Sequence, residues 1–218
     1  METKREQLEN KRMMQKFLQF LNSKTDTFIL TGTASYSMCY GMPLYRYYID
    51  LDGDDISLLS DIIVEFCKAN NLGLRVSRSN KHVDSWCVMK NNTMHFMIVP
   101  HNTVSERPTM YIEEHDGIRT YNINYLAMNC VLSYANNCNV ENTYNLVYII
   151  NNYFNFLNAD IIQLIICAFE KQRTHQMANL LRFCIYENID RKKLVDDLAE
   201  AFKRLGINTS LNHDSNIS

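Results

Sequence analysis

The sequence of 218 residues carries a formal net charge of −2 at pH 7, and 46% of its residues are hydrophobic. This length suffices for one domain with a helical extension or for two small domains, and the apolar content allows a packed core without cross-links. The balanced charge argues against strong, non-specific nucleic-acid binding, although a local basic patch is compatible with it.

The cysteines and the first residues of the sequence predict an intracellular protein. Seven scattered cysteines contain no CxxC pair, and an odd number cannot all pair internally. The charged segment 1–14 lacks the apolar core of a signal peptide, and no run approaches the roughly 18 apolar residues of a membrane span. We therefore expect a cytoplasmic, reducing location and no membrane association.

Hydrophobic periodicity predicts an α/β front half, residues 1–122. Residues 3–22 carry apolar side chains at helical spacing. Pro100 is expected to end the last strand of a β-hairpin. The further elements expected here are a strand at 28–30, a small-residue turn at 31–35 with a helix-like segment after it, a helix at 57–71, and strands at 72–77, 85–89, 94–99, 110–112 and 118–121.

The period becomes helical at Ile123 and stays so in the back half. Asp55 or Ser57 is a possible N-cap of the helix expected at 57–71, and the segments 158–160 and 188–190 supply caps between later helices. The polar tail 207–218 is expected to be disordered. The helices expected after Ile123 lie at 123–135, 142–157, 159–171, 174–187 and 190–205. The order of elements predicts an α+β fold, with a mixed sheet and flanking helices followed by a helical region, 123–206, that packs on the core.

Two aspartates follow the turn at 31–35. Asp50 and Asp52 lie two residues apart on an expected strand, so their carboxylates share one face and repel unless a cation lies between them. Mg²⁺ takes oxygen ligands and is usually held by one or two carboxylates with substrate phosphates. Gly32 and Thr33 stand at an expected helix N-terminus, where phosphates bind readily. The alternative is an exposed acidic turn, LDGDD, with its charges in water.

Two stretches carry a resemblance to a known family: TGTASYSMCYGMPLYRYYIDLD, and GIRTYNINYLAMNCVLSYANNCNVENTYNLVYIINNYF. Over roughly residues 28–155 they resemble the AbiEii/MenT-type (DUF1814) nucleotidyl transferases, the toxin components of toxin–antitoxin and phage-abortive systems. The resemblance implies a nucleotidyl-transferase core. It also implies transfer of a nucleoside monophosphate from an NTP to a hydroxyl on RNA, tRNA or protein, with Mg²⁺ or Mn²⁺ as cofactor. An antitoxin-like protein partner is implied as well.

The resemblance assigns roles to particular residues of the front half. Asp50 and Asp52 fall on the metal-binding, catalytic acids. The nucleotide-binding positions fall on the turn and on the arginine before the acids: Gly32, Thr33, Ser35 and Arg46.

The back half departs from the family pattern. The family's phosphate-contacting lysine falls on Cys130, and two of its acids fall on Asn142 and Asn145. Two arginines of the pattern fall on Asn137 and Glu141. These replacements raise a second hypothesis, a catalytically degenerate fold kept as a binding or interaction module. A third hypothesis treats residues 123–205 as a partner-binding bundle and the acids as a surface turn.

Two further groups of residues invite a functional interpretation. His82, His95 and His101 lack metal-ligand spacing and are interpreted as ordinary hairpin residues. A small basic and aromatic cluster could hold a nucleotide or an RNA end by charge and stacking, but ordinary strand-edge residues are the preferred interpretation. This cluster consists of Arg75, Arg78, Lys81 and Trp86.

Overall fold

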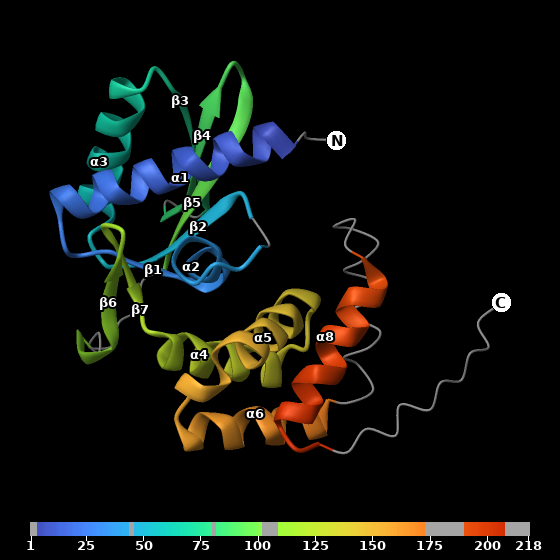
Figure 1. Ribbon diagram of the computed structural model, residues 1–218. Helices are drawn as coiled ribbons and strands as arrows, with labels where there is room; N and C mark the ends of the chain where they lie inside the picture. Colours follow the sequence, from blue (N-terminus) through green and yellow to red (C-terminus); the bar gives the residue numbers. More distant parts are fainter. Residues whose placement is uncertain (1–3, 44–45, 80–81, 102–108, 173–189, 208–218) are drawn as a thin grey trace. The chain divides into compact units, whose positions relative to one another are not determined.

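The computed structural model describes residues 4–43, 46–79, 82–101, 109–172 and 190–207 (Figure 1). These residues form two compact units, Met1–Asn122 and Ile123–Ser218. The expected helix at 174–187, and the expected disorder at 208–218, lie outside the described residues.

The first unit contains a seven-stranded mixed sheet in the order β3-β4-β5-β2-β1-β7-β6. Its central strand β2 runs antiparallel to β1 and parallel to β5, and β1 runs parallel to β7. The strands are β1 (Ile29–Thr31), β2 (Tyr48–Asp52), β3 (Gly73–Ser79), β4 (His82–Lys90), β5 (Thr93–His101), β6 (Ile112–His115) and β7 (Ile118–Tyr121). The predicted mixed sheet with flanking helices is therefore confirmed.

Two helices, α1 (Lys4–Lys24) and α3 (Ile56–Ala69), share one hydrophobic core with the sheet (Figure 1). The rings of Phe17 from α1 and Phe66 from α3 meet edge to face, with centroids 5.2 Å apart. Ile49 and Leu51 of β2 belong to this core. Because side chains alternate along a strand, the two aspartates of β2 lie on the opposite face of the sheet.

Several local predictions are confirmed and others are wrong. Asp55 caps α3 by accepting a hydrogen bond from the N–H of Leu58. Pro100 does not end β5, which continues to His101 with Pro100 opposite Leu51. The pairing of β5 with β4 does not extend beyond Ile98. Pro100 lacks a backbone N–H, and it fits here because β5 no longer needs to donate a hydrogen bond to β4 at this position.

The segment expected as a strand at 110–112 is also different in the structure. Thr109–Tyr111 forms a short 3₁₀ turn, and β6 begins only at Ile112. The N–H of Asn122 donates to the carbonyl of Tyr111, so the turn has a tertiary partner that a local pattern does not reveal.

The second unit is helical in its described part. Tyr134 and Phe169 stack with ring centroids 5.5 Å apart, and Phe169 meets Phe202 edge to face at 5.7 Å. Helix α5 begins at Val140, two residues before its expected start, and Asn139 caps it. The elements are α4 (Ile123–Asn136), α5 (Val140–Tyr153), the 3₁₀ turn η2 (Phe154–Phe156), α6 (Ala159–Lys171) and α8 (Arg191–Arg204).

The cysteines of the described residues are free thiols, six in number. Burial raises the pKa of Cys67 to about 11, and burial with the nearby Glu113 charge raises that of Cys39 to about 12. Both thiols therefore stay protonated at neutral pH. Among the described helices, none is long and apolar enough to cross a bilayer.

Gly53 closes the strand that carries the aspartates, and a side chain has no room there. A Cβ atom on Gly53 would lie 2.1 Å from Cδ1 of Phe28, a ring that is 1% exposed. We expect Gly53→Ala to lower the free energy of unfolding by roughly 1–3 kcal/mol, the usual cost of overpacking. Urea denaturation measures this. The matched variant Gly73→Ala places its Cβ 3.4 Å from Met89 and should change stability by less than about 0.5 kcal/mol. Equal losses would contradict the packing.

Candidate functional site

The site is built around the turn that joins β1 to α2 (Gly32–Cys39). Thr31 ends β1 in an extended conformation, and Gly32 then takes a φ of +66°. A left-handed conformation of this kind favours glycine, because a Cβ would clash with the backbone. A Cβ at this position would also lie 2.6 Å from Oδ2 of Asp50. The missing side chain therefore lets the carboxylate of Asp50 lie directly against the start of α2.

Strand β2 presents its two aspartates beside this turn. In the antiparallel register Asp50 is opposite Thr31, and Asp52 is opposite Ile29. The side chain of Asp50 is 16% exposed, and Asp52 as a residue is 6% exposed. The alternative of an exposed acidic turn, LDGDD, therefore holds only for the last two residues of that segment, Asp54 and Asp55, which are exposed.

His101 lies next to the acids and was missed by the sequence interpretation as a hairpin residue. Its Nε2 is 2.8 Å from Oδ1 of Asp50. The hydrogen bond to Asp50 raises the pKa of His101 above its ordinary value of 6.5, against the opposing effect of partial burial. The imidazolium form can thus balance part of the carboxylate charge.

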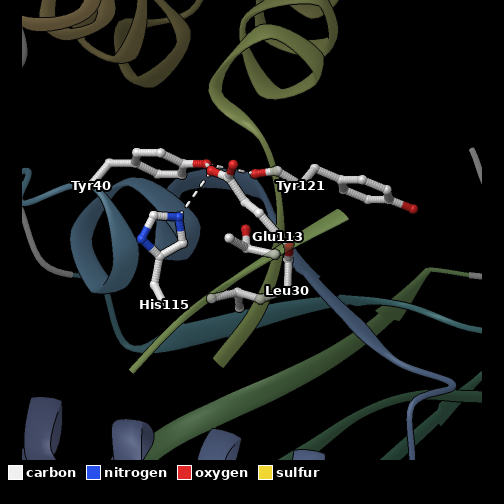
Figure 2. Close-up of polar contacts among 6 residues, drawn as sticks. Leu30, Tyr40, Glu113, His115 and Tyr121 are labelled. Atoms are coloured by element: carbon white, nitrogen blue, oxygen red, sulfur yellow. Dashed lines mark hydrogen bonds and ion pairs between the residues drawn. The ribbon is translucent and has the colours of Figure 1, made fainter. Parts of the chain in front are cut away.

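Tyr121 is the second neighbour that the sequence did not reveal. Its hydroxyl donates to Oδ2 of Asp52 at 2.5 Å, and the tyrosine is 1% exposed. Figure 2 shows how the main chain of Tyr121 is held: the hydroxyl of Tyr40 donates to its carbonyl oxygen at 2.9 Å and also to Glu113. His115 completes this cluster with Nε2 2.9 Å from Oε1 of Glu113.

The other predicted site residues lie in the first turn of α2 and before β2. Thr33 and Ser35 are both buried. The hydroxyl of Ser35 has no hydrogen-bond partner among the described residues, and Thr31 makes no side-chain cap for α2. In contrast, α3, α5 and α8 all have side-chain caps. Arg46 is partly buried and precedes β2 by two residues.

The donor set of this site suits a hard divalent cation completed by substrate oxygens. Within the described ranges, no group of three or more His, Cys, Asp or Glu side chains is arranged to hold a metal ion. Two carboxylates on one strand face are the number that Mg²⁺ commonly uses when phosphates supply further ligands. The buried, unpartnered Ser35 hydroxyl adds a polar atom close to the turn. Asp50 and Asp52 therefore fit a Mg²⁺ ion that arrives with a nucleotide.

The family positions that differ in this sequence have structural contacts in the second unit. The thiol of Cys130 lies 3.7 Å from the carbonyl oxygen of Asn142, and Asn145 is 3% exposed. Asn137 follows the end of α4, where its N–H bonds to the carbonyl of Ser133.

The proposed basic and aromatic cluster does not form a stacking surface. Trp86 is fully buried in the core of the first unit, so its indole is not available to a base from solvent. Arg75 and Arg78 are exposed on β3, and Lys81 lies outside the described residues. The strand-edge interpretation therefore holds for the two arginines.

The contact between Asp50 and Gly32 gives the first prediction for the site. Gly32→Ala forces Oδ2 of Asp50 away from the turn, in addition to the left-handed strain of roughly 1–2 kcal/mol. Gly117→Ala has the same strain at φ +76°, but its nearest contact is 3.7 Å away at Gln19. We expect Gly32→Ala to be about 1 kcal/mol less stable than Gly117→Ala in urea denaturation.

We also expect the pKa of His101, measured by NMR, to fall in Gly32→Ala and not in Gly117→Ala. Equal stability and an unchanged His101 pKa would argue against the contact.

The raised pKa of His101 predicts a pH dependence of stability in metal-free protein. The contribution of the His101–Asp50 pair is complete below pH 6.5 and is lost as the pH rises through the higher pKa of the folded state. Since the His101 side chain is 48% exposed, we expect only a few tenths to about 1 kcal/mol. Urea denaturation of wild type and His101→Gln between pH 5.5 and 9 measures it. Their difference should shrink as the pH rises, and a difference that grows would refute the assignment.

Solved structures share this fold, whereas no protein-family model and no curated protein sequence matches the chain. JHP933 from Helicobacter pylori is 15% identical, with a TM-score of 0.72 over 93% of this chain and 92% of that one. A second H. pylori protein, described as a candidate nucleotidyltransferase, is 14% identical with a TM-score of 0.72 over 94% and 96%. MenT4, a nucleotidyltransferase toxin from Mycobacterium tuberculosis, is 11% identical with a TM-score of 0.50 over 74% and 63%.

These neighbours agree with the nucleotidyl-transferase core that the sequence resemblance implied. They do not connect the chain with the AbiEii (DUF1814) group in particular. The chain therefore has a nucleotidyltransferase-like α+β fold.

Proposed function

We propose that this protein transfers a nucleoside monophosphate from an NTP to a hydroxyl acceptor, with Asp50 and Asp52 holding Mg²⁺. One observation carries the proposal: the carboxylate of Asp50 lies against Gly32 at the start of α2, on the strand face that also bears Asp52. A metal held by the acids would thus lie beside backbone N–H groups suited to phosphate. The fold shared with nucleotidyltransferases supports this assignment.

The reaction needs one bond to form and one to break. The acceptor hydroxyl oxygen attacks the α-phosphorus, the bond from that phosphorus to the bridging oxygen of the β-phosphate breaks, and pyrophosphate leaves with the electron pair. The hydroxyl proton passes to solvent or to a basic group. Mg²⁺, when bound, would offset phosphate charge and favour ionisation of the acceptor hydroxyl.

In this proposal, different residues of the first unit bind the cation and the phosphates. Asp50 and Asp52 supply the anionic oxygens that hold the cation. Gly32 and Thr33 offer N–H groups at the start of α2 to the β- and γ-phosphates, where the helix dipole favours negative charge. Ser35 has an unpartnered hydroxyl in the same turn of the helix, and Arg46 brings a positive charge to the start of β2.

The proposed acceptor is an RNA, with tRNA included, or a protein hydroxyl. The likeness to MenT4, which is named a nucleotidyltransferase toxin, supports a toxin-like role and an antitoxin-like protein partner for this chain. Mn²⁺ is the alternative cation, because it accepts the same oxygen ligands.

The degenerate hypothesis is the second candidate and rests on specific residues. Cys130, Asn142 and Asn145 lack the charges found at the corresponding family positions. Removing one preorganised charge commonly costs on the order of 10²–10³ in rate. The paired acids and the open turn at Gly32 are retained, and they favour the active form.

Nucleotide binding gives the first part of the test. We expect NTP with Mg²⁺ to raise the melting temperature of wild type, because ligand binding stabilises only the folded state. Asp50→Asn should remove this rise while keeping the fold. Asp54→Asn is the matched control, since Asp54 is an exposed aspartate on the turn directly after β2. A rise that persists in Asp50→Asn would contradict the metal role.

Transfer itself is measured with the same proteins. Each of the four NTPs, labelled at the α-phosphate, is incubated with Mg²⁺ or Mn²⁺ and total RNA or protein. We expect label on the acceptor with wild type and Asp54→Asn, and a loss of at least about 100-fold with Asp52→Ala. Nucleotide-dependent stabilisation without any transfer would instead support the degenerate hypothesis.

A further inference from the structure

The two acids of β2 are held by neighbours of very different kinds. Asp50 meets His101 on β5, and the side chain of this histidine is 48% exposed. Asp52 accepts a hydrogen bond from Tyr121, and both residues are buried, at 6% and 1% exposure. Asp52 and its partner are thus much less exposed to solvent than the Asp50–His101 pair.

The hydroxyl of Tyr121 is positioned by the surrounding sheet and by Tyr40, the residue that follows α2. Tyr121 pairs with Ile112 across the β6–β7 hairpin. The preceding Thr120 donates through its hydroxyl to the carbonyl of Leu30 at 3.0 Å, and the Tyr40 hydroxyl donates to the carbonyl of Tyr121 (Figure 2). Contacts with β6, with β1 and with Tyr40 therefore fix the backbone from which the phenol reaches Asp52.

We infer that Tyr121 is a positioning residue for the cation site, and that it acts by orienting the carboxylate of Asp52. This inference rests on the proposed function. A buried carboxylate needs hydrogen-bond donors to stay ionised and to keep one rotamer, and Tyr121 supplies a donor at 2.5 Å to Oδ2. With Oδ2 held in this way, the direction of Oδ1 is set as well.

Groups that hydrogen-bond to a metal ligand commonly change metal affinity by 10–100-fold when they are removed. Tyr121→Phe keeps the buried ring and removes only the donor. We therefore expect this variant to bind the cation more weakly by at least about tenfold, because the carboxylate of Asp52 then loses a donor that holds its orientation.

A purely structural role for the Tyr121–Asp52 bond predicts a different result. In that case Tyr121→Phe lowers stability without a matching change in cation affinity. Ser37→Ala is the control, because it also deletes a single buried hydroxyl in the first unit. That hydroxyl donates to the carbonyl of Ala34 within α2 at 3.2 Å, and it is none of the contacts described above for Tyr121.

The experiment is a titration of the full chain with Mn²⁺ in the presence of an NTP analogue that resists transfer, followed by the enhancement of water-proton relaxation that protein-bound Mn²⁺ produces. It compares wild type, Tyr121→Phe, Ser37→Ala and Asp52→Asn, with urea denaturation of each metal-free protein in parallel. We expect at least tenfold weaker binding in Tyr121→Phe, a change of less than about twofold in Ser37→Ala, and still weaker binding in Asp52→Asn.

The outcomes separate this inference from the proposed function. Equal Mn²⁺ affinities of wild type and Tyr121→Phe, with Asp52→Asn impaired, would overturn the role of Tyr121 and leave the cation site standing. Equal weakening in Ser37→Ala and Tyr121→Phe would also overturn it, because general loosening would then explain the effect. Absence of Mn²⁺ binding by wild type with the NTP analogue present would overturn both the inference and the proposed cation site.

Discussion

The close approach of the Asp50 carboxylate to Gly32 is the constraint on which the site depends. It requires a residue without a Cβ at the start of α2, because any side chain there would overlap Oδ2 of Asp50. It also requires the antiparallel register that sets Asp50 opposite Thr31. The result is an anionic strand face beside the N-terminal turn of a helix. Two carboxylates on one strand face repel each other, so a cation that binds between them and phosphates that bind at the turn would stabilise the arrangement.

The arrangement of the aspartates and the glycine could be predicted because it depends on residues that are close together in the sequence. Asp50 and Asp52 share a face by strand alternation, and Gly32 follows an apolar strand directly. His101 and Tyr121 could not be found in the same way. Each reaches the acids through a strand pairing between distant segments, β2 with β5 and β1 with β7, and spacing along the chain does not specify such registers.

The expectations that the structure corrects have equally physical causes. The less favoured alternative, in which Trp86 joins nearby arginines in a stacking surface, fails because strand alternation directs Trp86 into the core with Val88, Phe96 and Ile98. Pro100 was expected to stop a strand, yet it is tolerated beyond the last pair with β4. In the second unit, Cys130 and Asn142 contact each other. Uncharged residues at these positions are therefore compatible with a folded helical unit.

A crystal structure of the protein with Mn²⁺ and an NTP analogue that resists transfer tests the cation site and the phosphate site together, through the anomalous signal of the metal. We predict a Mn²⁺ peak bound by Asp50 and Asp52, with the β- and γ-phosphates at the N–H groups of Gly32 and Thr33. A nucleotide bound away from this turn, or a metal that contacts neither aspartate, would contradict it.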